Sequence, residues 1–72
     1  MSAVLAAPSF APPLNRCAAI SYRVREAARA LNAHVDVTVN AVSLALDHYA
    51  HGASAYRAIK QGETHIREQV SQ

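Results

Sequence analysis

The sequence has little of the covalent cross-linking that stabilises many very small proteins. One cysteine, Cys17, occurs in 72 residues, so no disulfide can form within the chain, and a reducing compartment is indicated. A chain of this length forms one domain and buries only about 60% of the surface that its unfolded form exposes. We therefore expect a second copy to complete a thin core, giving a homodimer.

The sequence also lacks the groups of residues on which catalysis depends. Only two glycines are present, which leaves no glycine-rich loop to cradle a phosphate, and no carboxylates are closely paired. Cys17 falls on an apolar helical stripe, where a small buried hydrophobe is a better interpretation than a nucleophile. We expect no catalytic residue, no cofactor, no small-molecule substrate and no enzymatic activity.

The histidines do not form the pattern of a metal site. His48 and His51 are three residues apart on one expected helical turn, and Asp47 precedes His48. Transition metals need three or four converging ligands, and neither a second cysteine nor an HExxH sequence completes the set. We therefore predict solvated or helix-capping histidines and no bound metal.

Long apolar runs are missing as well. None approaches the ~18 residues of a membrane span, so no membrane contact is expected. Residues 1–13 have no basic leader, and their three prolines interrupt both helix and sheet. We expect a cytoplasmic protein with a flexible Ala/Pro-rich arm over 1–13 and a single small helical domain over 14–72. In an alternative reading, Leu5 and Phe10 of the arm dock on a partner subunit.

What the sequence does contain is helical periodicity. Over 16–33, apolar residues recur at spacings of three and four, which predicts a helix with one buried stripe. Asn15 is its expected N-cap, with Leu14 as a possible staple. The stripe consists of Cys17, Ile20, Val24, Ala27 and Leu31.

Residues 34–40, HVDVTVN, support two interpretations. Their valines alternate with polar residues, which is the period of a strand with one buried face. A lone strand needs a partner, however, and nothing else in the chain has β character. We favour a loop that leads into a helix over 37–51, ended by Gly52, and keep the strand, paired across a dimer, as the alternative.

A third helix is expected over 54–70, with Ser54 as its N-cap. Its predicted stripe is Tyr56, Ile59, Glu63, Ile66 and Val70. Gly62 lies inside this segment, where it destabilises a helix by about 1 kcal/mol relative to alanine. This glycine either allows another helix to approach closely or breaks the helix in two.

Charge is distributed unevenly along the chain. Four arginines oppose one glutamate in the 16–33 segment, the middle segment carries two aspartates, and the last has three basic and two acidic residues. The high isoelectric point therefore reflects one basic helix, which permits nucleic-acid binding without requiring it.

Two segments resemble DNA-binding motifs. Ser54–Thr64 resembles the first part of a helix-turn-helix, with Ala58 as the small residue, Gly62 at the turn and Thr64 capping the recognition helix. Residues 34–40 with the following helix are similar to a ribbon-helix-helix regulator. That likeness implies a strand whose alternate side chains read the major groove.

The residues that these resemblances implicate fall into two groups. The strand would present His34, Asp36, Thr38 and Asn40 to the bases. The helix-turn-helix reading adds Arg57, Lys60, Thr64 and Arg67 as nucleic-acid contacts.

A protein-binding surface is the other candidate. On the first helix, Tyr22 lies opposite the apolar stripe beside Arg25 and Arg29, a combination enriched at interface hot spots. The ordinary alternative is a solvated face. Further along the chain, four residues form either a partner groove or a second buried face and corner: Leu44, His48, Tyr49 and Tyr56.

We conclude that the chain is all-α, with two to three helices in antiparallel hairpins, completed by homodimerisation and with a short strand at 34–40 left open. The expected function is non-enzymatic: an adaptor or inhibitor of another protein, of the kind that prokaryotic mobile elements carry, acting by helix-mediated contact. A small dimeric DNA-binding regulator of helix-turn-helix or ribbon-helix-helix type is the alternative.

Overall fold

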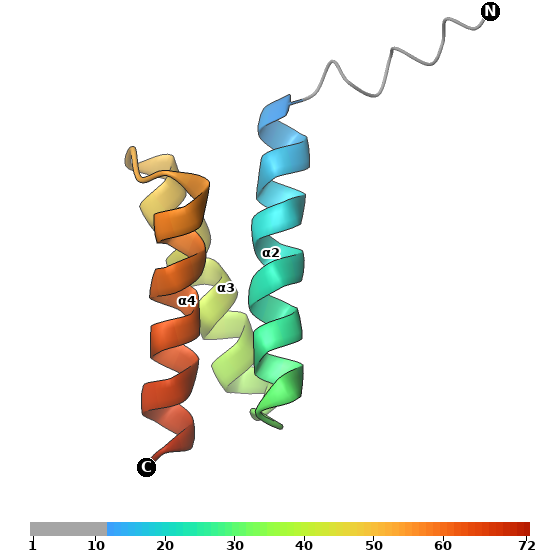
Figure 1. Cartoon of the computed structure of the whole chain (residues 1–72), viewed down its shortest axis with the longest axis vertical. Coiled ribbons are helices and arrows are strands. Elements are labelled where there is room, and N and C mark those ends of the chain that lie inside the picture. The colour runs from blue at the N-terminus through green and yellow to red at the C-terminus, as the bar shows by residue number, and fades with distance from the viewer. Residues whose placement is uncertain (1–11) are drawn as a thin grey trace, which may run out of the picture.

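The computed structural model of the protein describes residues 12–72, which form three helices: α2 (Pro12–Ala30), α3 (Val35–Ala50) and α4 (Ala55–Val70). The chain runs along α2, returns along α3 and turns again into α4, so α2 and α4 point the same way and α3 packs against both (Figure 1). The predicted all-α hairpin architecture is therefore confirmed. The described residues contain no strand.

The start of the first helix differs from the prediction. Helix α2 begins at Pro12 and ends at Ala30, so Asn15 lies inside the helix and is not its N-cap. Proline is tolerated in the first helical turn because the backbone N–H groups there have no partner within the helix. Of the predicted flexible arm, residues 12 and 13 are thus helical, and residues 1–11 lie outside the described part.

The two connections between helices have the same backbone geometry. Asn32 and Gly52 both have positive φ, 55° and 105°. The N–H of each residue and of the alanine after it donates back to the preceding helix, at 3.1 and 2.9 Å in the first connection and 3.2 and 3.0 Å in the second. This pattern is a Schellman motif. It confirms Gly52 as the residue that ends α3, whereas the matching role of Asn32 was not anticipated.

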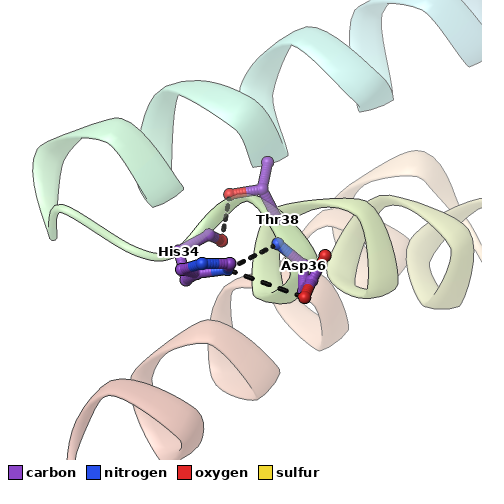
Figure 2. A network of polar contacts seen from close by, with 3 residues as sticks. All are labelled: His34, Asp36 and Thr38. Carbon is purple, nitrogen blue, oxygen red and sulfur yellow. Dashed lines mark hydrogen bonds and ion pairs between the residues drawn. The ribbon is translucent and has the colours of Figure 1, made fainter.

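The residue after each connection caps the next helix. Ser54 accepts a hydrogen bond from the backbone N–H of Arg57 at 3.1 Å, as predicted. His34 acts in the same way for α3: its Nδ1 accepts from the N–H of Asp36 at 3.1 Å (Figure 2). Helix α3 starts at Val35, two residues before the predicted start at 37, so the favoured helix is confirmed and the alternative strand at 34–40 is not formed.

A second contact lies beside the cap. The same Nδ1 atom of His34 is 3.8 Å from a carboxylate oxygen of Asp36. Thr38 completes this cluster by donating its hydroxyl to the backbone oxygen of His34 at 3.2 Å.

The core consists mainly of small side chains. Four of its seven buried hydrophobic residues are alanines: Ile20, Val24, Ala28, Ala41, Ala45, Ala58 and Ile66. The three large buried side chains, Ile20, Val24 and Ile66, lie on the stripes predicted for the first and third helices. Other members of those stripes, Leu31, Tyr56 and Val70, are exposed. In α3 the buried positions are Ala41 and Ala45, while Val39 remains 56% exposed. In α4, Ala58 and Gly62 are buried, and Tyr56 points outward.

At Gly62, α4 packs closely against both of the other helices. A Cβ atom placed there would lie 2.9 Å from a methyl group of Val24 in α2 and 3.2 Å from the backbone oxygen of Ala41 in α3. Helix α4 is continuous through this position. The glycine therefore serves close packing, and the turn that the helix-turn-helix resemblance placed here does not exist.

Replacing this glycine tests the packing directly. Gly62→Ala should lower the free energy of unfolding by about 1 kcal/mol net. Overpacking against the rigid Val24 and a backbone oxygen costs about 1–3 kcal/mol, and this loss outweighs the gain of about 1 kcal/mol in helix propensity. Urea unfolding measures the change, with Gln61→Ala, at an exposed position of the same helix, as the control. An alanine variant more stable than the wild type would contradict the close approach.

Candidate protein-binding surface

Several large side chains lie on the surface of the bundle. Six of them are exposed hydrophobic or aromatic residues: Tyr22, Leu31, Val35, Val39, Tyr56 and Val70. Tyr56 is the most exposed, at 69%. Contiguous groups of such side chains on a small protein mark places where another molecule binds. The fold decides which of them share one surface with basic and apolar side chains.

One hollow combines an exposed aromatic ring with basic and apolar side chains. It has a volume of about 310 Å³ and is lined by Arg23, Ala55, Tyr56, Ile59, Lys60 and Glu63. Five of these residues belong to α4, and Arg23 of α2 forms the opposite side. The hollow thus lies where α2 and α4, which run side by side in Figure 1, face each other.

The α4 side of the hollow is organised around Lys60. Its Nζ atom lies 5.5 Å from the centroid of the Tyr56 ring, within cation–π range. The same atom is 3.9 Å from a carboxylate oxygen of Glu63, at the outer limit of an ion pair. Tyr56, Lys60 and Glu63 are spaced four and three residues apart, which places them on one side of a helix.

Arg23 is the basic residue of the hollow that forms no ion pair with another described residue. Among the described residues, no carboxylate lies within ion-pair distance of its guanidinium, in contrast to Arg29 and Lys60. The side chain is exposed. An exposed guanidinium with no internal partner can form bidentate hydrogen bonds with an incoming carboxylate.

The predicted surface on the first helix is a separate one. Tyr22 is 56% exposed, and Arg25 and Arg29 are exposed three and seven positions further along. Arg29 forms a weak surface ion pair with Glu26, at 3.6 Å. Arg23 and Arg25 are about 200° apart around the helix, so the hollow and this outer surface occupy different sides of α2.

The remaining partner-binding candidates from the sequence do not join one surface. Tyr49 is half-buried and packs against the core, so it does not form an exposed pair with Tyr56. Leu44 and His48 are half-buried on α3. Tyr49 is therefore a packing residue of α3, and Tyr56 is the residue of this group that lines the hollow.

The proposed nucleic-acid contacts lose their geometric basis. In a helix, residues two apart point about 200° from each other, so His34, Asp36, Thr38 and Asn40 cannot present one reading face. Three of them instead form the capping cluster of α3 (Figure 2).

The same holds for the helix-turn-helix reading. Thr64 lies within the continuous α4 and caps no helix. Arg57, Lys60 and Arg67 are exposed on α4, with Lys60 alone of the three lining the hollow.

Two further findings concern the described residues. Among residues 12–72, no three histidine, cysteine, aspartate or glutamate side chains come together as a metal site would require. None of α2, α3 and α4 combines the length and the apolar character needed to cross a membrane.

Four residues of the hollow were not identified from the sequence as site residues: Arg23, Ala55, Ile59 and Glu63. Ile59 and Glu63 had been assigned to the predicted stripe of the third helix, whose spacing already placed them near Tyr56. Arg23 had no such signal, because its place opposite Tyr56 depends on how α2 packs beside α4.

Comparisons with protein-family models, with curated proteins and with solved structures find no match to this chain. Its candidate function therefore rests on the residues and their geometry alone.

The three tyrosines should separate into structural and surface residues. Tyr49→Ala should lower the free energy of unfolding by about 2 kcal/mol, because its ring packs against the core. Tyr22→Ala and Tyr56→Ala should each change it by less than about 0.5 kcal/mol, because both rings are largely exposed. Chemical unfolding of the three variants measures this, and an equal loss in all of them would contradict the assignment.

Proposed function

We propose that this chain is a small non-catalytic protein-binding module, an adaptor or inhibitor, that engages its partner along the adjoining sides of α2 and α4. The observation that carries the proposal is the hollow that the exposed Tyr56 of α4 and Arg23 of α2 line together. Tyrosine and arginine are among the residues most enriched at the energetic centres of protein interfaces.

The form of the hollow agrees with this role. Its floor includes the half-buried Ile59 and the small Ala55, which can receive an apolar side chain of a partner. At about 310 Å³ it is at the lower limit of small-molecule pockets. A space of this size suits one or two anchoring side chains of a protein better than a whole small ligand.

DNA binding is the weaker candidate. The excess of basic residues on α2 and α4 favours it in a general way. The ribbon-helix-helix motif, however, depends on a strand at 34–40, and the helix-turn-helix motif depends on a turn at Gly62. Residues 35–40 and Gly62 are helical instead. What remains is non-specific attraction to phosphates, which the experiment below separates from protein binding.

A pair of matched tyrosine variants tests the proposed surface. The full chain is immobilised and used to capture proteins from a nuclease-treated lysate. Tyr56→Ala should reduce capture of the specific partner by about tenfold or more, as for a hot-spot residue, while Tyr22→Ala should leave it unchanged. Both variants must have the helicity of the wild type.

Other results would redirect or end the proposal. Loss of capture in Tyr22→Ala alone would move the binding site to the outer surface of α2. If material binds only when the lysate has not been treated with nuclease, the DNA-binding candidate is supported instead.

Self-association is a second part of the proposal, and α3 supplies the surface for it. Val35 and Val39 are 65% and 56% exposed, and their spacing of four places them on the same side of the helix. Two β-branched apolar side chains of this kind on a bundle with a small core favour burial against a second copy.

A single charge on α3 tests this association. Val39→Glu should shift the mass measured by light scattering from dimer to monomer, because a carboxylate would have to be buried at the contact. Asn40→Glu, at the next exposed position, should leave the dimer intact. A wild-type chain that is monomeric at every concentration would rule out the dimer.

A further inference from the structure

We propose that the partner presents an acidic peptide segment to the α2/α4 hollow, with an apolar side chain beside a carboxylate. The apolar group would sit against Ile59 and the Tyr56 ring, and the carboxylate would pair with Arg23. This inference rests on the proposed function, and it adds the chemistry that the partner must have.

The charge of the bundle is arranged by helix. The charged residues of α2 are four arginines and one glutamate, and those of α4 are three basic and two acidic residues, whereas α3 has two aspartates and no lysine or arginine. The adjoining α2 and α4 therefore carry the whole positive excess, and α3 carries the opposite sign. An acidic segment is attracted to α2 and α4, and Arg23 and Lys60 are the cations of these two helices that line the hollow.

Within the hollow, the two cations differ in availability. Lys60 is shared between the ring of Tyr56 and the carboxylate of Glu63. Arg23 has no carboxylate partner among the described residues and lines the hollow together with Lys60. A partner carboxylate would thus gain its main hydrogen bonds from Arg23, with Lys60 in a supporting position.

The same residues argue against a nucleic acid as the occupant. Ile59 and Ala55 line the hollow and provide an apolar surface that a phosphate does not use. A peptide that places an apolar anchor beside a carboxylate uses this surface as well as Arg23.

The experiment is a selection from a display library of random short peptides on the immobilised full-length chain. Selected peptides should be enriched in aspartate or glutamate next to a large apolar residue. Synthetic versions should bind at least about tenfold more weakly to the double variant Arg23→Glu, Lys60→Glu, since a reversed charge removes the hydrogen bonds and adds repulsion. Their affinity for the wild type should fall as salt is raised.

The control is a double variant with the same change in net charge on the other side of α2. Arg25→Glu with Arg29→Glu alters residues that do not line the hollow, so the selected peptides should bind it almost as well as the wild type. Equal loss in both double variants would show only general attraction and would overturn the proposal. All variants are exposed substitutions, and circular dichroism checks that they remain helical.

The outcomes also separate this inference from the proposed function. Peptides without acidic residues that still depend on Tyr56 would overturn the acidic partner and leave the binding surface intact. If no peptide is selected and Tyr56→Ala captures the same proteins as the wild type, both proposals fail. An oligonucleotide that displaces the peptides and depends on Arg23 would replace the acidic peptide by a nucleic acid.

Discussion

The close packing of α4 against α2 and α3 at Gly62 is the constraint on which the rest of the structure depends. Position 62 has room for a hydrogen atom and not for a methyl group, because the Val24 side chain of α2 and the backbone of Ala41 in α3 fill the space. The backbone of α3 can come this close only where the residue on α4 is small. Alanines make up four of the seven buried hydrophobic residues, which limits how much apolar area the bundle can bury.

A core with four alanines leaves several larger side chains at the surface. Val35 and Val39 on α3 and Tyr56 on α4 are exposed although they are residues that a hydrophobic pattern would place inside. Tyr56 and Ile59, on the same helix as Gly62, line the hollow between α2 and α4.

The sequence predicted the local features of the fold well where a single residue determines them. Ser54 caps α4 through a hydroxyl that can reach a backbone N–H, and Gly52 ends α3 because glycine adopts positive φ without strain. The predicted start of α2 was wrong because the prolines of residues 1–13 were expected to prevent a helix. Pro12 and Pro13 are acceptable in the first turn of a helix. The cap formed by His34 was missed because histidine is not among the preferred N-cap residues.

The sequence by itself determined that the chain is helical, where α3 ends and α4 begins, and how charge is divided among the helices. These properties depend on residues close to one another along the chain. Only the tertiary structure decided which side of α3 and α4 faces inward, that Gly62 is a packing position, and that Arg23 lies opposite Tyr56. Periodicity fixes the angles between side chains on one helix, but the direction of the core depends on how closely the neighbouring helices can approach.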